Sequence, residues 1–184
     1  FDIEIVSKEE LVERIKNDTL CDILLDKDHT FGASGRPTDI SRRIKKPTNE
    51  KFQSWFNSFF SYMTDVCIYL RNDSYIAAQY AFQDARIPLL KMVEASVAAN
   101  SDFSVNLGYN GQNLKAYMDQ ETYNHFTRTF SSMRFDTLWD AVFQACMVFR
   151  KEGLHLAEVC GYEYPKETDV RILRKFRELW GDTV

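Results

Sequence analysis

Glycine and proline are scarce in this sequence, with 7 and 4 residues among 184. Since these residues form many of the tight turns in proteins, a helical fold is favoured over one dense in strands. The chain also lacks an apolar run long enough to cross a bilayer and a recognisable signal peptide. It has no initiator methionine before Phe1. We therefore expect a piece of a longer cytoplasmic protein with no membrane association.

The four cysteines form no C-x-x-C pair and follow no zinc-ligand spacing. We interpret them as reduced thiols, as expected in the cytoplasm. The formal net charge is −4 and the isoelectric point about 5.4. This charge argues against general nucleic-acid binding, which needs clustered basic residues. It suits a cationic ligand, or simply a solvated acidic surface.

The beginning of the chain resembles the end of a sheet-containing domain. Residues 1–6 alternate apolar and polar side chains with the period of a half-buried strand. Ser7 and Glu10 then have the spacing of a capping box that opens a helix. The apolar run at residues 21–25 predicts a second strand. Residues 1–28 are thus expected to be a short β-α-β remnant of an α/β domain.

Residues 29–47 hold glycines, prolines and a basic cluster, and we interpret them as a linker. Residues 48–184 are expected to form a helical bundle of about five helices, so the chain is mainly α. Thr48 is placed to cap a helix over residues 49–71, where large apolar side chains recur every three or four residues. A second long helix is expected from residue 73 to about 99.

Several sequence motifs could have a catalytic or metal-binding role, but their residue spacing supports that role only weakly. Asp26-Lys27-Asp28 has the carboxylate spacing of a magnesium site, but we interpret it as a turn with solvated charges. The three histidines have no partner at metal-ligand spacing, which argues against zinc. No nucleophile elbow is present.

Two other patterns are stronger candidates. Asp2 projects from the predicted first strand, where a carboxylate can bind a cation or accept a proton, although it can also be the solvent side of a strand. Tyr80, Asp84, Lys91 and Glu94 fall within one narrow sector of the second long helix. Taken alone, this polar stripe fits a solvated face with a Lys91–Glu94 pair.

A resemblance to a known family runs nearly from end to end. The segment I-P-L-L-K-M-V-E at residues 87–94 resembles R-P-E-L-L-[KR]-M-x-[ES]-W of the aminoglycoside 6-adenylyltransferases. Around it, D-I-E-I at residues 2–5, L-L-D-K-D at 24–28, K-P-T at 46–48 and G-Y-E-Y-P at 161–165 resemble other family motifs in the same order. Ile87 and Leu89 differ from the family's arginine and glutamate.

The resemblance implies an enzyme that moves AMP from ATP to a hydroxyl of a streptomycin-like aminoglycoside, and so confers antibiotic resistance. It implies ATP as co-substrate and Mg²⁺ as cofactor. By position in the motifs, Asp2 would be the general base or a metal ligand and Lys91 an ATP contact. Tyr80, Asp84 and Glu94 would contact the aminoglycoside. Residues 48–184 would be the helical substrate-binding domain of the enzyme.

The family's metal-binding D-x-D motif is not in this sequence, and Asp26-Lys27-Asp28 corresponds to a different family motif. We therefore expect the chain alone to be inactive. The resemblance is to bacterial cytoplasmic proteins, and we expect a monomer or a homodimer. The alternative is a non-catalytic helical module that partners a separate nucleotidyltransferase subunit.

Overall fold

The structure, a computed structural model, describes residues 3–31, 36–130, 132 and 134–181, and these residues are mainly helical. In chain order the helices are α1 (Lys8–Asn17), η1 (Ile40–Arg42), α2 (Asn49–Arg71), α3 (Tyr75–Ala99), η2 (Tyr109–Gly111), α4 (Leu114–Tyr117), α5 (Gln120–Arg128), α6 (Phe135–Cys160) and α7 (Lys166–Gly181). The predicted mainly α class is confirmed. No helix in these ranges is both long and apolar enough to cross a membrane.

The predicted β-α-β remnant is not shown by the structure. Its helix is present as α1, and the Ser7 side chain accepts a hydrogen bond from the Glu10 backbone N–H at 3.2 Å, as the capping box predicted. Neither residues 3–6 nor residues 21–25 form a strand. A strand needs a hydrogen-bonding neighbour, and the described residues supply none to either segment. Ile3 and Ile5, which form the apolar side of the alternating pattern, are exposed, so the described residues show neither a buried face nor a sheet here.

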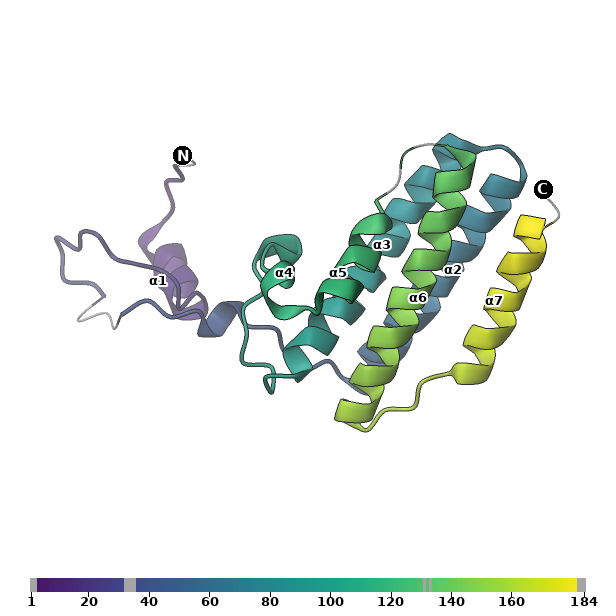
Figure 1. Ribbon diagram of the computed structural model, residues 1–184. Coiled ribbons are helices and arrows are strands. Elements are labelled where there is room, and N and C mark those ends of the chain that lie inside the picture. Colours follow the sequence, from purple (N-terminus) through teal and green to yellow (C-terminus); the bar gives the residue numbers. More distant parts are fainter. Residues whose placement is uncertain (1–2, 32–35, 131, 133, 182–184) are drawn as a thin grey trace.

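The segment that contains α1 is tied to the linker by polar contacts. The Thr38 backbone N–H donates to the Thr19 carbonyl at 2.8 Å, and Arg42 of η1 forms an ion pair with Asp18. The linker then meets the bundle where the Ile44 backbone N–H donates to the Val105 carbonyl. In Figure 1, α1 lies away from the long helices.

The long helices begin and end where the sequence has the corresponding signals. The Thr48 hydroxyl accepts from the Lys51 backbone N–H and caps α2. Gly161 ends α6 with φ of 74°, a left-handed conformation that glycine adopts without strain. Pro88 lies inside α3, and the helix runs through it from Tyr75 to Ala99.

The long helices pack as a bundle around one apolar core. Helices α2 and α3 form an antiparallel hairpin, α6 packs against both, and α5 and α7 cover the sides (Figure 1). Aromatic rings fill the contact between α2 and α6. The rings of Phe59 and Phe149 stack with centroids 4.0 Å apart and an interplanar angle of 2°. Both side chains are fully buried, so this contact fixes how closely the two helices approach.

Truncating this contact should weaken the whole bundle. We expect Phe149→Ala to lower the free energy of unfolding by about 3–5 kcal/mol, because it removes a buried ring and leaves a cavity. Urea denaturation followed by circular dichroism measures the change. Tyr109→Ala, at an exposed position, is the control and should change stability by less than about 0.5 kcal/mol. Equal effects of the two substitutions would contradict the proposed role of the stacked rings.

Candidate functional site

Helix α3 carries the four predicted site residues of the polar stripe, but in two different environments. Tyr80 is 74% exposed and Asp84 is exposed, one turn apart on the amino-terminal half of the helix. Lys91 and Glu94 lie two to three turns further on. The Lys91 Nζ is 2.9 Å from Glu94 Oε2. The structure therefore brings Lys91 and Glu94 together and leaves Tyr80 and Asp84 open to a ligand.

The Lys91–Glu94 pair is asymmetric. Glu94 is only 3% exposed, whereas the side chain of Lys91 is half-exposed. A buried carboxylate needs a charged or hydrogen-bonding partner, because desolvation is costly. Lys91 supplies that partner, so a ligand that engages Glu94 must approach alongside or displace the ammonium group.

The predicted general base, Asp2, lies outside the described residues. Asp26, in the D-K-D segment, accepts hydrogen bonds from the Phe31 and Thr30 backbone N–H groups at 2.9 and 3.0 Å. These bonds hold the pKa of Asp26 below its ordinary value. The carboxylate thus closes a turn, as its interpretation as a turn predicted. Across the described parts of the chain, no group of three or more His, Cys, Asp or Glu side chains could hold a metal ion.

Two of the family-like motifs meet in space, far apart in sequence. The hydroxyl of Tyr162 donates to the Pro47 carbonyl at 2.6 Å, and Gln53 Nε2 donates to the Glu163 carbonyl at 2.7 Å. These bonds fix the connection between α6 and α7 against the start of α2. The K-P-T and G-Y-E-Y-P motifs therefore form a structural latch.

The second tyrosine of the latch belongs to a buried polar network. The Tyr164 hydroxyl donates to Asp169 Oδ2 at 3.1 Å, and Arg150 Nε donates to the same oxygen at 2.5 Å. Asp169 is 1% exposed, and burial raises the pKa of Tyr164. A Cβ atom on Gly153 would lie 2.7 Å from the Tyr164 ring, so glycine is needed where the ring crosses α6.

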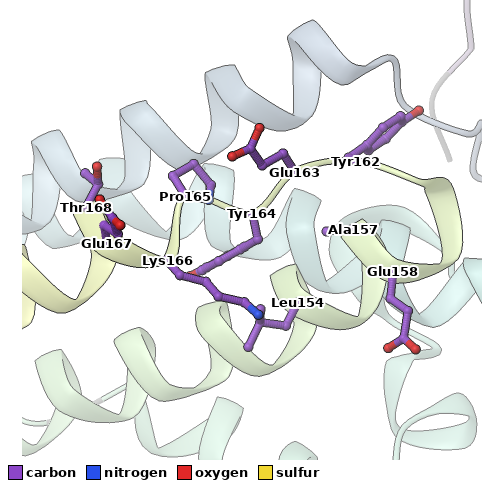
Figure 2. Close-up of a pocket in the computed structure, with 10 residues that line it drawn as sticks. All are labelled: Leu154, Ala157, Glu158, Tyr162, Glu163, Tyr164, Pro165, Lys166, Glu167 and Thr168. Atoms are coloured by element: carbon purple, nitrogen blue, oxygen red, sulfur yellow. The ribbon is translucent and has the colours of Figure 1, made fainter.

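A cavity of about 740 Å³ lies beside this latch, between the end of α6 and the start of α7. Figure 2 shows its lining, in which the Lys166 side chain extends toward Leu154 and Glu158 projects from the last turns of α6. The tyrosines that line it already donate their hydroxyls to protein acceptors. The charged groups of this cavity are exposed side chains, so the cavity has no desolvated group to fix the orientation of a ligand.

A smaller cavity of about 280 Å³ lies where the end of α3, α4 and the start of α5 meet α6. It contains polar groups that the sequence analysis missed. They are Asn100, Asp119, Lys151, Glu152 and His155. Glu152 is 7% exposed and accepts a hydrogen bond from the Ser96 hydroxyl at 2.6 Å. The sequence signal was a glutamate whose helical neighbours three and four positions away, Val148, Phe149 and Leu156, are apolar.

Comparison with solved structures finds a protein with a similar fold. A solved structure described as an aminoglycoside 6-adenyltransferase from Bacillus subtilis superimposes with a TM-score of 0.67 at 24% identity. The match covers 94% of this chain and 63% of that one, and it shows a shared fold. A model of the streptomycin adenylyltransferase family matches residues 1–178. The chain belongs to this family.

Curated relatives are described as aminoglycoside 6-adenylyltransferases. Aminoglycoside 6-adenylyltransferases from Bacillus subtilis (strain 168) and Campylobacter jejuni are 29% identical over 150 residues and 27% identical over 166 residues. These matches cover 81% and 90% of this chain, but 53% and 58% of the relatives. The chain thus spans a little more than half the length of the proteins it resembles.

The latch yields a prediction about stability. Tyr164→Phe should lower the free energy of unfolding by about 1–2 kcal/mol, because it removes one hydrogen bond to the buried Asp169 carboxylate without removing the ring. Tyr109→Phe, which alters an exposed hydroxyl, is the matched control and should have no effect. Thermal unfolding at neutral pH measures both. An unchanged free energy of unfolding in Tyr164→Phe would show that the hydrogen bond from Tyr164 to Asp169 Oδ2 contributes no stability.

A second prediction concerns Asp119, the N-cap of α5. Hydrogen bonds from Thr122 and the nearby Lys151 lower the pKa of Asp119 from 3.8 to about 2. Because the folded pKa is the lower one, the stabilisation is complete above about pH 4 and is lost as the pH falls toward 2. Asp119→Asn keeps an N-cap acceptor but does not titrate. The free energy of unfolding should therefore fall less steeply between about pH 4 and 2 in this variant, and parallel curves would refute the assignment.

Proposed function

We propose that the protein containing this chain transfers AMP from ATP to a hydroxyl of a streptomycin-like aminoglycoside, and that this chain is its carboxy-terminal part. The observation that carries the proposal is the match of the streptomycin adenylyltransferase family over residues 1–178. The relatives described as aminoglycoside 6-adenylyltransferases support the same substrate class. In this reaction the acceptor hydroxyl oxygen bonds to the α-phosphorus of ATP, and pyrophosphate leaves.

The proposed roles of the stripe residues follow from their exposure and charge. Tyr80 and Asp84 present a phenol and a carboxylate to solvent on one face of α3, which suits hydrogen bonds to an ammonium or guanidinium group. Lys91 is half-exposed and is proposed to contact ATP phosphates, with Glu94 holding it in place or binding the substrate. The net charge of −4 also favours a cationic substrate.

Asp2 is proposed as the general base that takes the proton from the acceptor hydroxyl. A positioned carboxylate can accelerate such a proton transfer by about 10²–10⁴-fold. The family resemblance also assigns Asp2 to a magnesium site. The proposed roles of this chain are contacts with the acceptor and its proton, and the contact of Lys91 with the ATP phosphates.

The test uses the protein extended upstream of Phe1 and compares it with the 184-residue chain. The extended protein should transfer label from α-labelled ATP to streptomycin, and the chain alone should not. Within the extended protein, Asp84→Asn should raise the KM for streptomycin about fivefold with little change in kcat, because an exposed ion pair contributes up to about 1 kcal/mol.

Asp65→Asn on the exposed back of α2 removes the same charge away from the stripe and should leave KM unchanged. Activity of the extended protein with unaltered KM in Asp84→Asn would remove Asp84 from the substrate site. No transfer to any aminoglycoside in a panel would contradict the proposed function and favour a non-catalytic binding module.

A further inference from the structure

The cavity between α3, α4, α5 and α6 is lined by a buried carboxyl group, that of Glu152, with one oxygen that accepts no hydrogen bond from the described residues. Glu152 Oε2 accepts the Ser96 hydroxyl at 2.6 Å. The other oxygen, Oε1, has no hydrogen-bond partner among the described residues, and it is not among the polar atoms sealed from solvent. The side chain as a whole is 7% exposed, so this oxygen reaches solvent through the cavity that Glu152 lines.

Lys151 and His155, which line the same cavity as Glu152, are bound to other acceptors. The Lys151 Nζ lies 3.2 Å from Asp119 Oδ2 and donates to the Thr122 hydroxyl. His155 Nε2 lies 2.8 Å from Asn100 Oδ1, which requires the proton on Nε2 because the amide oxygen can only accept. Neither group forms a direct ion pair with Glu152. Burial accordingly raises the pKa of Glu152 despite the positive charge nearby.

The rest of the cavity wall is apolar or aromatic. Val97 from α3 and Met118 after α4 supply apolar surface, and Tyr117 supplies a half-exposed ring. At about 280 Å³ the cavity is smaller than a typical site for a whole drug, and it fits one ring with its substituent. A desolvated carboxylate beside an aromatic ring and apolar side chains can orient an organic cation.

We propose that this cavity is a subsite for an ammonium or guanidinium group carried on a small ring, with Glu152 as its counter-ion. The cation donates to Glu152 Oε1, and the Ser96 hydroxyl holds the carboxylate in position. The identification of the ligand as an aminoglycoside rests on the proposed function, whereas the cation site itself does not. The stripe on α3 and this subsite bind different parts of the ligand.

The test measures binding of streptomycin, which carries guanidinium groups, and kanamycin, which carries only amines, to the 184-residue chain by isothermal titration calorimetry at neutral pH. Sucrose is the uncharged probe. Glu152→Gln keeps an acceptor for Ser96 and removes the charge. It should weaken binding of the preferred cation at least about tenfold, the effect expected for losing one charged hydrogen bond.

The matched control is Glu158→Gln, which removes the same charge from an exposed position on the same helix, beside the other cavity. It should change affinity less than about twofold. If Glu152→Gln does not fold, Val97→Leu tests the same site from the opposite wall, since it adds a methylene group to the cavity and should also weaken binding. Circular dichroism verifies the fold of each variant.

Unchanged affinity in Glu152→Gln or Val97→Leu, or equal weakening by Glu158→Gln, overturns the subsite. Binding of neither cation by the unaltered chain, or equal binding of sucrose, also overturns it. The proposed function fails separately, when the extended protein transfers no AMP although Glu152-dependent binding persists. Conversely, AMP transfer with an unaltered KM in Glu152→Gln leaves the enzyme intact and removes the subsite.

Discussion

The burial of helix α6 is the constraint on which the rest of this structure depends. The helix packs against α2, α3, α5 and α7, so nearly every turn of it must match a neighbour. Stacking of Phe149 on Phe59 sets the approach of α2, and small residues such as Ala141 and Ala145 allow close packing elsewhere. Interiors packed at this density tolerate few polar groups, and each one present needs a partner.

Two charged side chains on α6 meet this requirement in different ways. Arg150 donates to Asp169 Oδ2 of α7, which also accepts from Tyr164, so the charge of Asp169 has a cationic partner within the protein. Glu152, half a turn away, has only the neutral Ser96 hydroxyl. The first arrangement closes the bundle at the α6–α7 connection. The second leaves a desolvated carboxyl group beside a cavity, which is the condition for binding a cation.

The sequence predicted those features that depend on residues close together in the chain. The three- and four-residue recurrence from Phe52 to Leu70 predicted α2, and Thr48 correctly marked the start of that helix. The strand at residues 3–6 was not observed, because an alternating pattern specifies a face but not the neighbouring strand that must pair with it.

In the candidate site too, contacts between residues close in the chain were predictable, whereas contacts between distant residues were not. Lys91 and Glu94 are three residues apart on a helix, so their ion pair was foreseeable from spacing. Ser96 and Glu152 are 56 positions apart, and their contact exists only because α3 and α6 pack side by side. The motifs at residues 46–48 and 161–165 could be recognised in the sequence. That they contact each other depends on the Tyr162–Pro47 hydrogen bond, which no spacing rule predicts.

Helix α3 contributes residues to both candidate binding regions, and the two regions differ in how strongly salt screens their carboxylates. Asp84 is exposed, so its attraction for a cation is screened by salt within about 8 Å at physiological ionic strength. Glu152 is desolvated, and interactions of buried charges are screened much less. A cationic ligand would therefore be drawn to the surface by the exposed carboxylates and oriented by the buried one. Affinity that persists at high salt would then reside mainly at Glu152, while the salt-sensitive part would belong to the stripe on α3.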